Sequence, residues 1–215
     1  MSDKRLPRDW PLHPAETAVL VVDAQASETT AETLAAYPHY GTIQRERAFP
    51  ALKRLVAGAR AAGCEIVYTV IEALTRDGRD RSLDHKLSGI LVPKGSPLAQ
   101  MVPEAGQTAD DIVLPKTSSG VFNSTNAAYV LRNLGVRQVI VAGLRTDQCV
   151  DMAIRDGADH GFYMVCAADA CATVTEAEHD AALKAFGGYC RVQTVDEILA
   201  DLEKGAQDTA PLPHV

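Results

Sequence analysis

Three residues whose chemistry is complementary each follow a short apolar segment of this 215-residue chain. They are an aspartate, Asp23, a lysine, Lys116, and a cysteine, Cys149. A carboxylate can accept the proton of a thiol, an ammonium group can stabilise a thiolate, and the thiolate can attack a carbonyl carbon. The three residue types together indicate a site with a nucleophilic cysteine.

Cys149 lies where an apolar strand changes into a helix. The run that starts at Val139 is strand-like until it breaks at Gly143, and helical periodicity begins near Asp147. The N-terminus of a helix has unpaired N–H groups and a partial positive charge, and both favour a thiolate over a thiol. We therefore expect Cys149 to be nucleophilic at neutral pH, while simple packing of a lone cysteine is the alternative.

Strand-like and helix-like segments alternate along the chain. This order predicts an α/β fold with a single doubly wound, Rossmann-like domain, in which helices cover both faces of a six-stranded parallel sheet. The expected strands cover residues 18–22, 64–70, 112–114, 138–142, 161–167 and 190–192, and the expected helices cover residues 46–62, 123–134, 147–158, 175–186 and 195–204.

The domain is expected to span residues 16–204, between an extended N-terminal tail, 1–15, and a flexible C-terminal tail, 205–215. Residues 71–100 carry many charges and few helix or strand signals. A long connection of this kind in a compact domain is more often functional than idle.

The carboxyl ends of parallel strands line one edge of the sheet, and sites in such folds form in the crevice beyond that edge. We therefore expect Asp23, Lys116 and Cys149 to face one crevice. Taken singly, the aspartate also fits a turn residue and the lysine a solvated side chain.

Composition excludes several classes of function. The net charge of −7 disfavours nucleic acid as a partner, because phosphate binding needs a basic surface. No apolar run reaches the roughly 18 residues that span a membrane, and we expect no signal peptide. The five cysteines lack CxxC spacing, so neither a disulfide framework nor a zinc site is expected. A cytoplasmic protein acting on a small molecule fits these features.

Three motifs in order resemble the isochorismatase-like cysteine hydrolases. They are Val-Val-Asp-Ala-Gln at 21–25, Leu-Pro-Lys-Thr-Ser-Ser-Gly-Val-Phe-Asn-Ser at 114–124 and Ala-Gly-Leu-Arg-Thr-Asp-Gln-Cys-Val at 142–150, with Arg-Asp-Gly at 155–157 and Asp-Ala at 169–170 downstream. The resemblance covers about residues 16–200. Within the family the chain is similar to the ureidoacrylate and N-carbamoylsarcosine amidohydrolases.

The resemblance implies a role for each residue of the motifs. Cys149 would be the nucleophile, Asp23 the general base and Lys116 the cationic third member. It also implies a non-proline cis bond between Leu144 and Arg145, and an oxyanion hole formed by the N–H groups of Arg145 and Cys149. The implied reaction is hydrolysis of an amide, ureido or carbamoyl C–N bond through a thioester.

Four residues are expected to contact the substrate. The guanidinium of Arg145 could hold a substrate carboxylate in a forked geometry; alternatively, it points to solvent or pairs with a neighbour such as Asp147. Glu72 follows the second strand and would face the same crevice as Asp23. The remaining two are Gln25, beside the first motif, and Phe122, which could wall the site or staple the next helix.

The chain departs from nicotinamidase-like relatives, which place a metal-binding Asp-x-His after the first aspartate. Here Ala24 and Gln25 follow Asp23, so we expect no metal and no cofactor, with His39 and His85 structural or exposed. Tyr37 and Tyr40 are expected in a loop that caps the pocket or packs an oligomer contact. A homo-oligomer, dimer or tetramer, is common in the family.

Three other functions remain open at this point. The family also contains vinyl-ether hydrolases, although the presence of Cys149 favours acyl transfer. A non-catalytic ligand-binding module would leave Cys149 no more reactive toward iodoacetamide than Cys64 or Cys190. A redox protein would need a second cysteine nearby, such as Cys166 or Cys171.

Overall fold

The part of the chain that the structure describes is built on a parallel sheet of six strands. The structure, a computed structural model, describes residues 8–208. The strand order is β3-β2-β1-β4-β5-β6, and every neighbouring pair is parallel. This confirms the predicted α/β class. The strands are β1 (Thr17–Val22), β2 (Glu65–Ile71), β3 (Ile112–Lys116), β4 (Gln138–Leu144), β5 (Tyr163–Ala172) and β6 (Cys190–Gln193).

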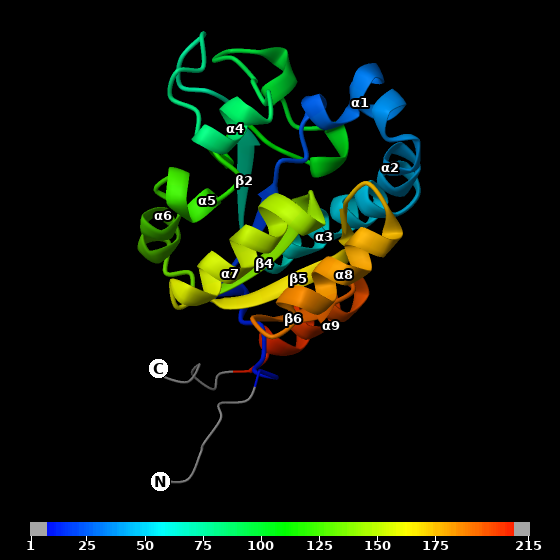
Figure 1. The fold of residues 1–215 in the computed structure, drawn as a ribbon. Coiled ribbons are helices and arrows are strands. Elements are labelled where there is room, and N and C mark those ends of the chain that lie inside the picture. Colours follow the sequence, from blue (N-terminus) through cyan, green and yellow to red (C-terminus); the bar gives the residue numbers. More distant parts are fainter. Residues whose placement is uncertain (1–7, 209–215) are drawn as a thin grey trace, which may run out of the picture.

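Helices lie on both faces of this sheet (Figure 1). Helices α2, α3 and α9 contribute buried residues to the core on one face, and α5 to α8 contribute to the core on the other. The helices are α1 (Ala31–Ala36), α2 (Pro38–Ile43), α3 (Phe49–Ala62), α4 (Leu83–Leu87), α5 (Val121–Ser124), α6 (Ala127–Asn133), α7 (Asp151–Asp159), α8 (Glu176–Phe186) and α9 (Val195–Gly205).

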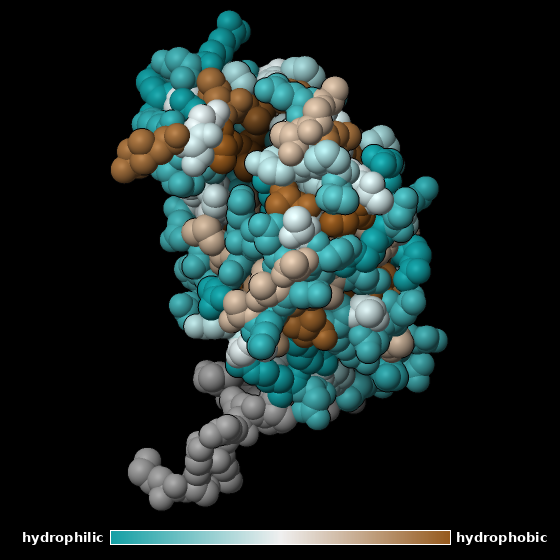
Figure 2. All heavy atoms as spheres, turned by 45° about the vertical axis from the view of Figure 1, so that its right-hand side comes forward, coloured by the Kyte–Doolittle hydropathy of each residue, from teal (hydrophilic) through white to brown (hydrophobic). Residues whose placement is uncertain are grey.

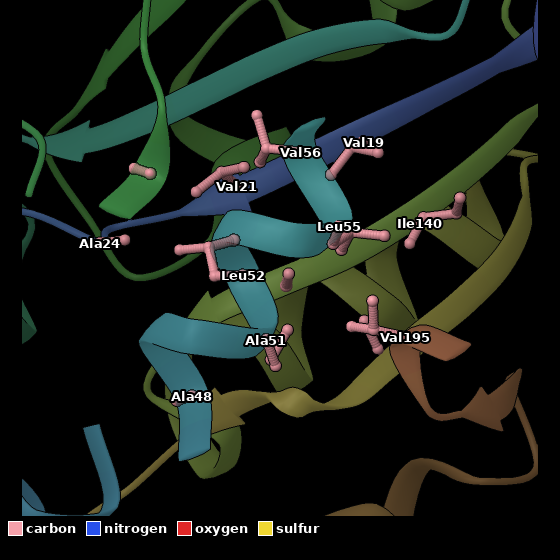
Figure 3. Packing of buried hydrophobic residues seen from close by; sticks show 14 of the residues in the cluster. Val19, Val21, Ala24, Ala48, Ala51, Leu52, Leu55, Val56, Ile140 and Val195 are labelled. Carbon is pink, nitrogen blue, oxygen red and sulfur yellow. The ribbon is translucent and has the colours of Figure 1, made fainter. Parts of the chain in front are cut away.

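Side chains of β1 alternate between the two cores. Val19 and Val21 belong to the first core, and Leu20 belongs to the second. Figure 3 shows α3 lying across the first face, with Leu52 and Leu55 directed toward the sheet. Burial of each of these leucines contributes about 1.5–3 kcal/mol. All six residues of β1 are buried, as expected for a central parallel strand.

The sheet is doubly wound about its centre. The chain adds β2 and β3 on one side of β1, and then β4, β5 and β6 on the other. Connections from β1 and β4 therefore leave in opposite directions and open a crevice between these two strands at their carboxyl ends. Asp23 follows β1 directly and Arg145 follows β4 directly.

Several predicted elements have different bounds. β5 continues to Ala172 rather than residue 167, after a register shift against β4 between Val141 and Gly143. The helix expected over 123–134 is two helices, because Thr125 is extended and its side chain accepts the N–H of Ala127. The segment before α7, Thr146–Val150, is a π-helical turn rather than α-helix.

Two short helical regions were not predicted from the sequence. Tyr37 and Tyr40 were expected in a loop. Tyr37 instead lies at the junction between α1 and α2, and Tyr40 lies within α2. Helix α4 lies in the charged segment 71–100, where Ser82 caps it by accepting the N–H of His85. Figure 1 shows α4 next to the tip of β2.

The N-terminal segment has neither helix nor strand from Asp9 to His13, and it is anchored to the domain. Leu12 is fully buried, and the N–H of His13 donates to the side chain of Gln138. Gly205 packs so closely on Leu12 that a Cβ there would lie 1.9 Å from the Leu12 carbonyl oxygen. The rest of the predicted tails, residues 1–7 and 209–215, lies outside the described residues. Among residues 8–208, no helix has the length and apolarity to cross a membrane.

Candidate active site

The crevice at the carboxyl ends of β1 and β4 opens into a cavity of about 900 Å³. Asp23, Arg145 and Cys149 line it, together with residues of α1, α4 and α7. The cavity therefore lies at the carboxyl ends of the strands, at the point where the winding of the sheet reverses.

Asp23 and Cys149 line this cavity, and both meet Lys116, which is buried behind its wall. The ammonium of Lys116, at the end of β3, lies 2.8 Å from Oδ2 of Asp23 and 3.3 Å from Sγ of Cys149. It also donates to the carbonyl oxygens of Ser118 and Ser119 at 2.9 and 3.2 Å. Lys116 is 0% exposed and is held in one position by four partners.

Asp23 is fixed by its backbone as well as by Lys116. Its φ is +49°, in the left-handed region, which aspartate tolerates better than most residues. The N–H of Asp23 donates to the carbonyl of Thr69, and the Thr69 hydroxyl donates to Oδ1 at 2.8 Å. One carboxylate oxygen therefore binds Thr69 and the other faces Lys116.

The electrostatics keep the thiol of Cys149 protonated. Burial, and after it the charge of Asp23, raise the pKa of Cys149; Lys116 offsets only part of this, and the net pKa is about 12. Desolvation therefore outweighs the favourable effect of the first helical turn in the free protein, and the nucleophilic role expected for Cys149 remains a prediction that requires a base. Burial lowers the pKa of Lys116, but Asp23 and Cys149 raise it to a net value above its usual one.

The segment between β4 and Cys149 depends on a glycine. The Leu144–Arg145 peptide bond is cis, as the family resemblance implied. Gly143 has a φ of +118°, and a Cβ at this position would lie 2.0 Å from the carbonyl oxygen of Val22. Only glycine lets β4 approach β1 this closely, where Cys149 and Asp23 must meet.

Arg145 reaches the cavity but is already paired. Its Nε lies 3.2 Å from Oε2 of Glu28, which also accepts the hydroxyl of Tyr40 at 2.8 Å. The guanidinium lies over the rings of Tyr37 and Tyr40, 5.0 and 5.1 Å from their centroids. Asp147, the alternative partner, instead accepts the hydroxyl of Thr173.

The sequence profile of the Isochorismatase domain matches residues 17–197. The chain belongs to the isochorismatase family. It is therefore an isochorismatase-family hydrolase, and the profile covers the segments that hold Asp23, Lys116 and Cys149.

Named relatives of this isochorismatase-family chain include an amidohydrolase. The ureidoacrylate amidohydrolase RutB of Rhizobium rhizogenes is 29% identical over 183 residues, which cover 76% of this chain and 73% of the relative.

Solved structures share the fold. A cysteine hydrolase from Pseudomonas syringae pv. phaseolicola superimposes with a TM-score of 0.81 at 23% identity, covering 95% of this chain and all of its own. The N-carbamoylsarcosine amidase of Thermoplasma acidophilum gives 0.69 at 23% identity, covering 85% and 98% of the two chains.

Gln25 and Glu72 were predicted to contact the substrate, but neither lines the cavity. Gln25 is fully buried, donates to the carbonyls of Ile71 and Leu98, and accepts the N–H of Ile71, so it clamps loops together. Glu72 lies outside the cavity and accepts the N–H of Gly95 at 2.7 Å, in a separate shallow depression. The adjacent Ile71 lines the cavity instead, since successive side chains of a strand face opposite sides.

Phe122 does not line the cavity either. Its ring stacks on Phe162 at 5.9 Å and packs on His160, within the core beneath α5 and α7. Phe122 therefore contributes to the apolar core and not to the wall of the cavity.

Sequence reasoning did not single out Glu28 or His85. Glu28 lies in a short helical turn after β1, with no periodicity or motif to mark it. His85 was expected to be structural or exposed; it is 1% exposed and contributes to the cavity wall beside Ser119. Burial and then Lys116 lower the pKa of His85, so its imidazole is neutral at pH 7. Within residues 8–208, no cluster of three or more His, Cys, Asp or Glu side chains could hold a metal ion.

Proposed function

We propose that this chain is a cysteine-dependent hydrolase of a small-molecule C–N bond in an amide, ureido or carbamoyl compound, and that it acts through a thioester. The observation that carries the proposal is the contact of one buried ammonium, Lys116, with both the Asp23 carboxylate and the Cys149 sulfur. The names of the RutB relatives and of the N-carbamoylsarcosine amidase add support for C–N chemistry.

In the first step Asp23 takes the thiol proton as the Cys149 sulfur adds to the substrate carbonyl. A base is required, because the raised pKa leaves little thiolate at neutral pH. As the proton moves to Asp23, negative charge moves to sulfur and then to the carbonyl oxygen. Lys116 lies beside both groups and balances the charge in either state.

The oxyanion would be held by the N–H groups of Arg145 and Cys149. Nearby N–H groups of Gln148 and Val150 are used elsewhere, since both donate to the Arg145 carbonyl. One lost oxyanion donor typically reduces the rate on the order of 10²–10³-fold.

Collapse of the tetrahedral intermediate breaks the C–N bond. Asp23 returns its proton to the leaving nitrogen, and a thioester remains on Cys149. Asp23 then removes a proton from water as the water oxygen attacks the thioester. When the C–S bond breaks, the acid is released and Asp23 returns the proton to the Cys149 sulfur.

The test is ammonia release from a panel of amides, ureido compounds and carbamoyl amino compounds. Turnover is expected with the unaltered protein and is expected to be lost in Cys149→Ala and Asp23→Asn. Cys64→Ala, which removes a buried thiol outside the cavity, serves as the matched control and should keep turnover. Mass spectrometry of quenched reactions should show an acyl adduct on the peptide that contains Cys149.

Undiminished turnover in Cys149→Ala would contradict the covalent scheme. Cleavage of a vinyl ether by that same variant, with no ammonia released from any compound, would favour the vinyl-ether hydrolases of the family instead.

For assembly and location we propose a cytoplasmic homo-oligomer, a dimer or tetramer. Apolar side chains gather at the end of the molecule that holds α4 (Figures 1 and 2), where Leu83 and Leu87 are 72% and 78% exposed. All five cysteines are free, as suits a reducing compartment. Light scattering should give two or four times the monomer mass of 23.0 kDa, and a monomer at micromolar concentration would contradict the oligomer.

A further inference from the structure

The wall of the cavity carries more negative than positive charge. Among residues 8–208, two cationic residues line it, Arg145 and Arg155, since His85 is neutral. The acidic residues that line it are Asp23, Glu28, Glu32, Asp84, Asp147 and Asp151.

Both arginines are already neutralised. Arg145 pairs with Glu28, and Arg155 pairs with Asp151 one helical turn away on α7. Lys116, behind the wall, pairs with Asp23. Each cation at or beneath the cavity therefore has a carboxylate partner.

The remaining acids have no such partner. Within residues 8–208, Glu32, Asp84 and Asp147 form no ion pair with lysine or arginine. Glu32 and Asp84 are exposed on α1 and α4, and Asp147 is partly buried before α7. A cleft lined by one sign of charge concentrates ligands of the opposite sign and repels those of its own.

We propose that the substrate carries no carboxylate, and that this site selects a neutral or cationic C–N compound. A substrate carboxylate would have to displace Glu28 from Arg145 and leave this partly buried carboxylate without its cation, or lie near unpaired acids; both are unfavourable. The inference rests on the proposed C–N hydrolysis and differs from the anionic compound for which the RutB relatives are named.

Three ureas of matched length test the proposal. Ureidopropionate is anionic, hydroxypropylurea is neutral and aminopropylurea is cationic, and all three share one cleavable carbamoyl group. Their affinity for Cys149→Ala is measured by calorimetry, which needs no turnover, and kcat/KM is measured with the unaltered protein. Circular dichroism checks that the variant keeps the fold, and inhibition constants in the unaltered protein give a second measure of binding.

The neutral and cationic ureas are expected to bind about tenfold or more tightly than the anionic urea. Binding of the cationic urea should weaken as salt is raised. Equal affinity for all three, tighter binding of the anion, or no binding of any would overturn the proposal. Binding in the expected order without ammonia release would leave the charge selectivity in place and contradict C–N hydrolysis.

A substitution of Glu28 gives a further test. Glu28→Gln keeps the size and the acceptor for Tyr40 but removes the charge that neutralises Arg145. The anionic urea is expected to gain affinity about tenfold relative to the neutral one. Glu176→Gln, which removes an ion pair with Arg47 outside the cavity, is the matched control and should leave the ratio unchanged. An unchanged ratio in Glu28→Gln would contradict the role of the Glu28–Arg145 pair.

Discussion

Lys116 has the greatest influence on the charge of the candidate site. Its ammonium is completely buried, and its contacts Asp23 and Cys149 are the two groups between which the proposed proton transfer takes place. Without it, Asp23 would be a buried carboxylate with no cation, and removal of one partner from a buried pair leaves a costly uncompensated charge. Catalysis and folding stability are therefore linked at this residue.

Lys116→Met is expected to abolish ammonia release and to lower the free energy of unfolding by about 3–5 kcal/mol. Denaturant titration followed by circular dichroism measures the stability. The double variant Asp23→Asn, Lys116→Met should regain part of the stability and none of the activity. Lys53→Met, an exposed lysine on α3, is the control, and a loss of similar size there would count against the buried pair.

At the residue scale, the sequence predicted the trio but only part of its surroundings. Asp23, Lys116 and Cys149 could be found because each lies at or just beyond a strand end, where parallel topology brings side chains together. The prediction that Glu72 faces the crevice was wrong, because the side to which a side chain points changes with each step along an extended segment. Glu28 could not be found, since its role depends on a contact with Arg145, 117 positions away in the chain.

At the element scale, the close approach of β1 and β4 sets the position of Cys149. Gly143 pairs with Val22 in the sheet and lies just before the segment that leads to Arg145. A side chain here would push the two strands apart at the mouth of the crevice.

Gly143→Ala is expected to lower stability and activity together, because the new Cβ meets backbone and the φ of +118° is strained for alanine. Gly63→Ala, with a φ of +93° and no atom within 4 Å of the new Cβ, isolates the conformational penalty of about 1–2 kcal/mol. Thermal unfolding and ammonia release compare the two. Equal losses in both variants would show that the contact with Val22 is unimportant.

The elements that were predicted well are those with strong local patterns. The apolar runs of β1, β2 and β4 and the spacing in α3 and α9 left little choice of structure. Helix α4 is only five residues long, too short to give a periodic pattern, and its exposed leucines do not resemble a buried face. The break between α5 and α6 depends on the extended backbone of a single threonine, Thr125.

At the scale of the whole molecule, buried thiols make stability sensitive to alkaline pH. Burial raises the pKa of Cys64, Cys149 and Cys190 from the ordinary 9.0 to about 12. Above pH 9 the unfolded chain loses these protons while the folded chain keeps them, so stability falls as pH rises. The stabilising contribution is complete below about pH 9 and is lost as pH passes through about 12.

The free energy of unfolding is expected to decline steadily between pH 9 and pH 12. The double variant Cys64→Ala, Cys190→Ala should show a shallower decline, whatever its stability at pH 7. Urea titrations at several pH values measure the slope. If the slope were the same in both proteins, the decline would have another origin.

Leu12 and Gly205 lie near opposite ends of the described chain and are in contact. A short peptide could join the chain near these two residues, and the chain could be opened elsewhere without parting any strand from its neighbours. Gly135, exposed between α6 and β4 with no atom near its Cβ position, is a suitable place for the new ends. Such a circular permutant is expected to fold and to keep the cavity, because β1 and β4 would keep their places while only their order in the chain changed.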